Sequence, residues 1–306
     1  FIGKNLELYF LDYKVEEPKY SAEEARVRNL TFKAGIRCKV RLANKNTGEI
    51  KEQSVFLGDF PLMTEQGTFI INGIERVVVS QIVRSPGVLF TSENIGGEDF
   101  FGAKIIPDRG AWLEIETSTK NILSVKIDRK RKIPITTLLK AFGYGNDNEL
   151  LKMFEDVDTN PERKYIRSTL DRDPATSSEA AILEVYKRIR PGDLVTVENA
   201  RTMIEKMFFD FRRYDLSKVG RYKINRRLGL DTPNDITHRV LQKEDIVGII
   251  REIIRLNNDP DGICDNIDHL KNRRVRAVGE LVQRRVRVGF LRVERMIKDR
   301  MSVADI

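Results

Sequence analysis

The spacing of apolar residues changes once along this 306-residue chain, and that change limits the folds open to it. In the first third, apolar and polar residues alternate, as in residues 36–42, which predicts half-buried β-strands. Asn72-Gly73 lies between two apolar runs and favours a hairpin, because both central residues of such a turn adopt positive φ. After Lys132, apolar residues recur every three or four positions, which predicts amphipathic helices and therefore an α+β fold.

A second hairpin is predicted from residues 111–116 and 123–127, which alternate on either side of a turn near Lys120. A hairpin centred there places Trp112 directly opposite Asp128 on the polar face. A large aromatic side chain on a polar face is an exception that calls for a cause. Trp112, the only tryptophan, is therefore either covered by another element or exposed for a ligand.

The last predicted helix, residues 278–301, carries apolar residues every three or four positions with arginines between them. We expect one face of this helix to pack and the rest to be basic. Earlier in the chain, Thr176-Ser177-Ser178-Glu179 is a capping box that predicts the start of another helix. Arg190-Pro191-Gly192 predicts where that helix ends.

Positive charge is unevenly distributed along the chain. Lys and Arg number 54 and Asp and Glu 46, a net charge of +8. Residues 267–306, with eleven Lys or Arg and five Asp or Glu, hold +6 of it, and residues 129–132 form a second basic cluster. Such clusters are typical of proteins that bind a polyanion, although a solvated basic face has the same composition.

Several function classes lack the residues that they need. His238 and His269 have no His or Cys at ligand spacing, and neither Cys38 nor Cys264 has a Cys neighbour, which excludes a zinc ribbon and a disulfide framework. The chain has no phosphate-binding Gly-Lys-Ser/Thr loop, no Gly-x-Ser-x-Gly elbow and no apolar run of membrane-spanning length. We therefore expect a cytoplasmic protein of about two domains that binds a polyanion and has no self-contained active site. Because the chain begins with Phe1, we also expect a fragment of a longer protein.

Five longer strings carry a family resemblance. They are GDFPLMT at 58–64, GTFIINGIERVVVSQ at 67–81, RSPGV at 84–88, RYDLSKVGR at 213–221 and NRRVRAVGEL at 272–281. In this order, the strings resemble the N-terminal region of the β subunit of bacterial DNA-directed RNA polymerase. The resemblance runs from about residue 5 to the end of the chain, and motifs this long leave little room for chance.

The resemblance implies a β-rich protrusion portion at residues 1–90, which the family completes with chain beyond the lobe. It implies a mixed lobe at residues 91–306, with a β-hairpin sheet and several amphipathic helices. The chain would then be a segment of a nucleotidyltransferase that acts in transcription, with no catalytic residues and no cofactor of its own. In the family, the β′ subunit holds the catalytic magnesium. The implied partners are DNA, the remainder of β, and the β′, α and sigma subunits.

The family also has a pocket that reads the non-template DNA strand just downstream of the active site. The resemblance assigns to this pocket Arg84, Trp112, Asp128, Arg190 and Asp305. Trp112 would stack on an unpaired base, and Asp128 or Asp305 would accept a hydrogen bond from a base edge. The implied role of the region is one jaw of the cleft that holds downstream DNA.

Two further sites are implied by position. One wall of the pocket that binds rifamycin antibiotics is matched by Arg76, Val79 and Gln81. An edge-strand motif on which the transcription-repair coupling factor and Tudor-like regulators dock by strand pairing is matched by Ile50, Lys51 and Glu52. From the residues alone, this second site is an ordinary charged strand edge.

A free-standing, non-catalytic nucleic-acid-binding module is the alternative that the residues leave open. Such a module would bind duplex or hairpin nucleic acid tightly, with a steep salt dependence. A jaw fragment would bind weakly, because its contacts are spread over a cleft that it only half forms. A small-molecule enzyme would need a cluster of titratable residues, and the sequence indicates none.

Overall fold

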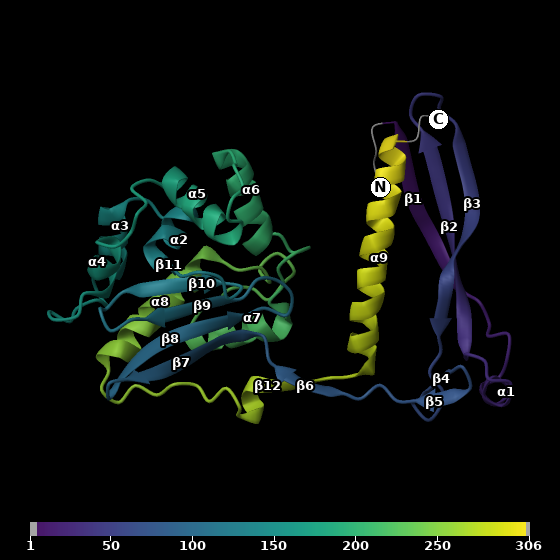
Figure 1. Cartoon of the computed structure of the whole chain (residues 1–306), viewed down its shortest axis with the longest axis horizontal. Helices are drawn as coiled ribbons and strands as arrows, with labels where there is room; N and C mark the ends of the chain where they lie inside the picture. The colour runs from purple at the N-terminus through teal and green to yellow at the C-terminus, as the bar shows by residue number, and fades with distance from the viewer. Residues whose placement is uncertain (1–4, 304–306) are drawn as a thin grey trace. The chain divides into compact units, whose positions relative to one another are not determined.

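A computed structural model of the chain describes residues 5–303, and the chain divides into two compact units. The N-terminal unit comprises the chain up to Ile82 together with the segment from Val275 onward. The central unit is continuous from Val83 to Arg274. Figure 1 labels the helices and strands of both units, which confirm the expected α+β fold.

A three-stranded antiparallel sheet forms the body of the N-terminal unit (Figure 1). Its strands are β1 (Leu6–Val15), β2 (Lys33–Asn44) and β3 (Ile50–Pro61), in the spatial order β1-β2-β3. The alternation predicted for residues 36–42 lies in β2, where Cys38 is buried and pairs with Tyr13 on one side and Val55 on the other. Because β2 is the central strand, β1 and β3 are the edges of this sheet.

The hairpin predicted at Asn72-Gly73 is confirmed. Strands β4 (Phe69–Ile71) and β5 (Ile74–Arg76) pair antiparallel on either side of it. Both turn residues have positive φ, +50° at Asn72 and +77° at Gly73, as this type of turn requires. The short helix α1 (Ala22–Val27) lies in the same unit and begins at Ser21, which forms a reciprocal capping box with Glu24.

The last helix, α9 (Val278–Val303), confirms the predicted helix but not its predicted packing. None of its described side chains is buried, and Phe290 and Leu291 are about half exposed. Together with Phe10 of β1 and Leu57 of β3, they line an open apolar hollow of the N-terminal unit. The apolar face of α9 is therefore only loosely covered by the described residues.

A five-stranded antiparallel sheet forms the core layer of the central unit. Its strands, in the spatial order β11-β10-β9-β8-β7, are β7 (Gly87–Ile95), β8 (Glu98–Ile106), β9 (Leu113–Thr117), β10 (Leu123–Ile127) and β11 (Ile133–Pro134). Leu113 and Val125 on one face are fully buried, whereas Glu114 and Lys126 on the other face are partly exposed. The predicted alternation is thus confirmed as one packed face and one polar face.

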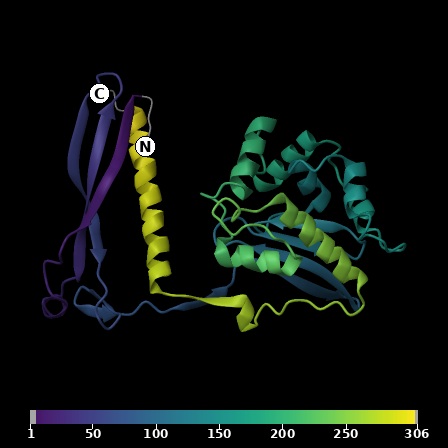
Figure 2. The same ribbon diagram turned by 180° about the vertical axis from the view of Figure 1, so that it is seen from behind.

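The helices of the central unit come after its sheet in the sequence. They are α2 (Ile135–Ala141), α3 (Asp147–Phe154), α4 (Tyr165–Leu170), α5 (Ser178–Ile189), α6 (Val197–Phe208), α7 (Ser217–Leu228) and α8 (Lys243–Asn258), followed by a 3-10 helix at Leu270–Asn272. Figure 2 shows α7 and α8 in front of the sheet, where α7 packs on β7 and α8 on β8. Ile250 and Ile253 of α8 are fully buried in the core that also contains Leu113 and Val125. Within residues 5–303, no helix combines the length and the apolar character that a membrane crossing requires.

Helix α5 begins and ends close to where the sequence predicts. Its N-cap is Ser177, whose hydroxyl accepts a hydrogen bond from the Ala180 N–H. The predicted capping box with Glu179 is wrong. With Ser177 as the N-cap, the third helical position is Ala180, which has no polar side chain to accept a hydrogen bond from the N-cap N–H. The predicted end is confirmed, since the helix stops at Ile189, directly before Arg190-Pro191-Gly192.

The two units divide the chain differently from the predicted ranges 1–90 and 91–306. A boundary at residue 90 falls inside β7, which pairs with β8 along its full length and cannot be split without breaking that ladder. At the other end, α9 groups with the N-terminal unit. The chain passes from one unit to the other at β6 (Gln81–Arg84) and returns at β12 (Arg273–Arg276), and these strands pair as a two-stranded sheet.

Candidate nucleic-acid interface

Trp112 and Asp128 lie opposite each other at the end of the β9–β10 hairpin, as predicted. Leu113 pairs with Ile127, which makes Trp112 and Asp128 the next opposing pair. The Asp128 N–H donates to the Trp112 carbonyl oxygen at 2.9 Å, and the Trp112 N–H donates to Asp128 Oδ1 at 2.7 Å. Asp128 and Arg129 both adopt positive φ, +48° and +59°. The Asp128 carboxylate therefore fixes the backbone of Trp112 where the chain turns sharply.

Arg129 covers part of the indole ring of Trp112. Its guanidinium carbon lies 5.4 Å from the ring centroid, which is within the range of cation–π attraction. The Arg129 side chain is 75% exposed and also forms a long ion pair, 3.9 Å, with Glu114. Trp112 itself is half-buried. Arg129 is therefore only weakly held over the indole ring, because exposed ion pairs contribute little.

The polar face of the hairpin carries a small network of paired charges. Lys126 Nζ lies 2.5 Å from Glu116 Oε1, and Lys132 Nζ lies 2.7 Å from Oε2. Burial disfavours the charged form of Glu116, but the hydrogen bonds from both lysines outweigh it and lower the pKa of this carboxyl. Within residues 5–303, no group of three or more His, Cys, Asp or Glu side chains is arranged to hold a metal ion. The chemistry that this face offers is charge pairing and hydrogen bonding.

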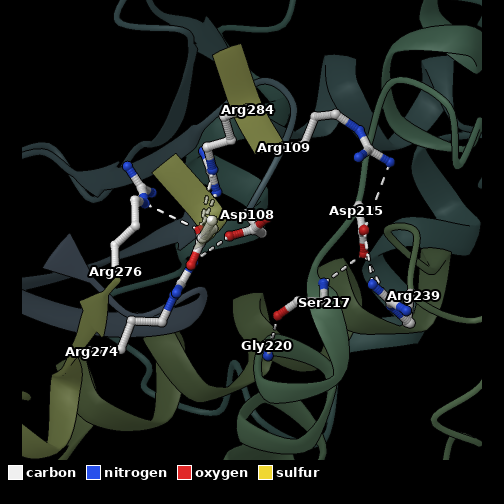
Figure 3. Close-up of polar contacts among 10 residues, drawn as sticks. Asp108, Arg109, Asp215, Ser217, Gly220, Arg239, Arg274, Arg276 and Arg284 are labelled. Carbon is white, nitrogen blue, oxygen red and sulfur yellow. Dashed lines mark hydrogen bonds and ion pairs between the residues drawn. The ribbon is translucent and has the colours of Figure 1, made fainter. Parts of the chain in front are cut away.

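Part of the RYDLSKVGR motif forms a polar support in the central unit (Figure 3). Asp215 is buried, and its carboxylate accepts hydrogen bonds from the Ser217 N–H at 2.7 Å and from Arg239 Nη2 at 2.9 Å. Arg109 Nη2 lies 3.7 Å from the same carboxylate. A Cβ on Gly220 would lie 3.2 Å from Pro86 Cβ, so glycine permits the close approach of α7 to the start of β7. These contacts stabilise the fold of the central unit, and no ligand is needed to explain why the residues are present.

The last residue of that motif, Arg221, forms a fully buried ion pair with Asp245 of α8. Two hydrogen bonds join the guanidinium and the carboxylate, Nη1 to Oδ1 at 2.7 Å and Nη2 to Oδ2 at 2.9 Å. Arg221 also donates to the carbonyl oxygens of His238 and Val240. The pair therefore ties α7 and α8 to the loop between them. Asp245 also lies in the first turn of α8, where an acidic side chain suits the helix dipole.

The structure brings together only part of the predicted non-template-strand pocket. Arg84 is the exposed last residue of β6, and Arg190 is the exposed residue that follows α5. Among the described residues, neither arginine makes a side-chain hydrogen bond or ion pair with Trp112 or Asp128. Asp305 lies outside the described residues. Trp112 and Asp128 are thus the two predicted residues that the structure places in direct contact.

The residues predicted for the antibiotic-pocket wall lie in the N-terminal unit on and after β5. Arg76 is the exposed last residue of β5 and pairs in register with Phe69. Val79 is 76% exposed, and Gln81 is the exposed first residue of β6. Their exposure leaves all three side chains accessible to further protein or to a ligand.

Ile50, Lys51 and Glu52 lie at the start of β3, the edge strand of the first sheet. The Ile50 side chain is 62% exposed. Glu52 is paired with Lys39 at 2.9 Å and with Arg41 at 2.7 Å, and their hydrogen bonds lower the pKa of its carboxyl. The predicted edge position is therefore confirmed, and this edge exposes an apolar side chain beside paired charges.

One contact of the interface was missed from the sequence. Residues 129–132 were recognised as a basic cluster, but the position of Arg129 over Trp112 was not. The signal was available, because an arginine directly after a residue that opposes a tryptophan in a hairpin is close enough to reach the ring. The positive φ of Asp128 and Arg129 turns the chain in this direction, and that geometry is not readable from residue types.

Comparisons with known proteins agree on one family. Residues 84–276 match the profile of RNA polymerase Rpb2, domain 2, and this range nearly coincides with the central unit. A DNA-directed RNA polymerase subunit beta from Chloroflexus aggregans is 50% identical over the whole chain, and one from Dehalococcoides mccartyi is 51% identical over the whole chain. A subunit beta from Syntrophomonas wolfei is 48% identical over 99% of the chain. The chain spans 24–27% of the length of these relatives.

Proposed function

Because the chain belongs to the β-subunit family of bacterial DNA-directed RNA polymerase, we propose that it forms one jaw of the cleft that holds downstream DNA. The N-terminal unit corresponds in this proposal to the protrusion and the central unit to the lobe. The chain contributes to nucleotidyl transfer as part of an assembly with the remainder of β and the β′, α and sigma subunits. Catalytic residues and magnesium belong to the β′ subunit, and this chain supplies grip and docking surfaces.

The single observation that carries the proposal is the half-buried Trp112 held by Asp128 at the end of a sheet. A tryptophan on a polar face, with its backbone fixed by two hydrogen bonds, is a preorganised platform for an unpaired base. Stacking of this kind is worth about 1–3 kcal/mol per base. Asp128 Oδ1 is occupied by the Trp112 N–H, so a base edge that donates to this carboxylate would use Oδ2.

The other predicted residues have secondary roles in the proposal. Arg84 and Arg190 are exposed cations that can contact the strand beyond the stacked base. Arg76, Val79 and Gln81 contribute one wall of the rifamycin pocket. Strand β3 offers Ile50, Lys51 and Glu52 to the transcription-repair coupling factor or a Tudor-like regulator, because an open antiparallel edge can accept a further strand.

Reconstitution tests the proposal. The chain is co-expressed with the remainder of a matching β subunit and with α and β′, sigma is added, and RNA synthesis from a promoter is measured. We expect assembly and promoter-dependent synthesis that is lost when the chain is omitted. Failure to assemble, combined with tight and steeply salt-dependent binding of duplex DNA by the chain alone, would instead support a free-standing nucleic-acid-binding module.

A further inference from the structure

A basic hollow of about 770 Å³ opens on the central unit beside the Trp112 hairpin. The residues from the turn after β10 are Arg129, Lys130 and Arg131, and those from the last turns of α5 are Glu184, Lys187 and Arg188. Five of these side chains are cationic and one is a carboxylate, an excess of four positive charges. A hollow of this charge, built from two separate elements, is suited to an anion.

Two of the cations in the hollow are held by the protein itself. Arg188 pairs with Glu184 one helical turn away, at 2.9 Å, and Lys130 Nζ donates to the Ile189 carbonyl oxygen. Arg131 and Lys187 are exposed and form no ion pair or side-chain hydrogen bond within the described part of the chain. Cations in the last turn of α5 also suit the helix dipole, which accounts for Lys187 and Arg188. It does not account for Arg131, which comes from another element.

Arg129 connects the hollow to the Trp112 platform. It lines the hollow and also lies over the indole ring, 5.4 Å from its centroid. A nucleotide whose base stacks on Trp112 therefore places its sugar–phosphate chain next to the hollow. Arginine presents a planar set of donors that matches phosphate oxygens, whereas lysine offers a compact point charge.

We propose that the hollow binds backbone phosphates of the same single strand whose base stacks on Trp112. The inference rests on the proposed function, and it deepens that function by naming a phosphate subsite and its residues. Arg131 and Lys187 supply the unpaired charge, and Arg129 forms the shared wall between base and phosphate. The chemical class recognised is the phosphodiester backbone of single-stranded nucleic acid, without selection among bases.

Salt dependence tests this subsite directly. Binding of a labelled twelve-nucleotide thymidine strand by the 306-residue chain is followed by anisotropy at increasing salt. Each lost phosphate contact lowers the log–log slope by about 0.7 for a single strand, so Arg131→Gln with Lys187→Gln should lower it by about 1.4. Raising the salt from about 50 to about 200 mM lowers the affinity of both proteins, and the factor of this loss should be about sevenfold smaller for the double variant than for the parent chain. The matched control is Arg201→Gln with Lys206→Gln, which removes the same charge from exposed positions of α6 outside the hollow and should leave the slope nearly unchanged.

Fluorescence of Trp112, the sole tryptophan, separates the subsite from the platform. Quenching on binding reports base stacking, and a strand of abasic units should bind through the hollow without quenching. If the thymidine strand does not quench Trp112 but the salt slopes of the hollow variant and its control still differ, the stacking role is wrong and the phosphate subsite is supported. If the thymidine strand quenches Trp112 but the salt slopes of the hollow variant and its control are equal, the phosphate subsite is wrong and the stacking role is supported. Absence of any binding at about 50 mM salt, where phosphate contacts are strongest, would overturn the subsite as well.

Discussion

Replacing Arg221 by methionine should destabilise the central unit by about 3–5 kcal/mol. The Arg221 and Asp245 side chains are both fully buried, and two short hydrogen bonds join them. The substitution removes the counter-charge and leaves a carboxylate in the interior with no cation beside it. The loss of stability comes mainly from this unpaired buried charge. The ion pair itself contributes little net free energy, because the cost of removing both charges from water offsets most of their attraction.

A second variant separates these two contributions. Arg221→Met combined with Asp245→Leu removes both charges, so the stranded carboxylate no longer contributes to the free energy of unfolding. The His238 carbonyl oxygen still loses its Arg221 donor, whereas the Val240 carbonyl oxygen keeps a 3.4 Å hydrogen bond from Gln242 Nε2. The Gln242 N–H in turn loses Asp245 Oδ2, its acceptor at 2.8 Å. A buried polar group left unpaired costs about 1–3 kcal/mol. We therefore expect the double variant to recover part of the stability lost in the single variant, with the remainder set by the backbone groups that lose a partner.

Urea unfolding of the 306-residue chain, followed by far-UV circular dichroism, measures both effects. The matched control is Arg255→Met in α8, the helix that carries Asp245, because Arg255 pairs with Glu252 at 2.7 Å but its side chain is 53% exposed. Exposed pairs contribute about 0–1 kcal/mol, so this variant should unfold near the parent midpoint. If Arg221→Met and Arg255→Met cost the same free energy, the reasoning about the buried charge is wrong.

Three further predictions concern the interface, the charged face and the sheet edge. Trp112→Ala should leave folding intact and weaken the hold on the unpaired non-template strand by about 1–3 kcal/mol; open complexes of unchanged lifetime on every template base would contradict the stacking role. The lowered pKa of Glu116 means that its pairs with Lys126 and Lys132 stabilise the fold above the ordinary carboxyl value of 4.5 and lose this effect as the pH falls through the lower folded-state pKa. Glu116→Gln should therefore flatten the loss of stability between about pH 5 and 3, and an unchanged profile from thermal unfolding would count against it. Ile50→Asp on the edge of β3 should reduce capture of a strand-pairing regulator in a pull-down while changing the free energy of unfolding by less than about 0.5 kcal/mol; equal capture would remove Ile50 from the docking surface.

Local structure was predictable where it depends on neighbours in the sequence. The Asn72-Gly73 turn and the end of α5 at Ile189 follow from backbone preferences of a few residues. The pairing of Trp112 with Asp128 follows from strand alternation and the centre of one hairpin. The family was likewise readable from contiguous motifs, because those strings carry their information in residue order.

Tertiary structure decided what joins segments that are distant in the sequence. Arg221 and Asp245 are both charged, and only packing of α7 against α8 shows that they bury each other. The basic hollow combines residues 129–131 with side chains of α5 that follow more than fifty positions later in the sequence. Helix α9 belongs to the N-terminal unit although the whole sequence of the central unit separates it from the first 82 residues. Periodicity shows which face of an element is apolar or charged, but it does not name the partner of that face. The partner is chosen by long-range packing, where burial rewards contacts between elements whatever their separation along the chain.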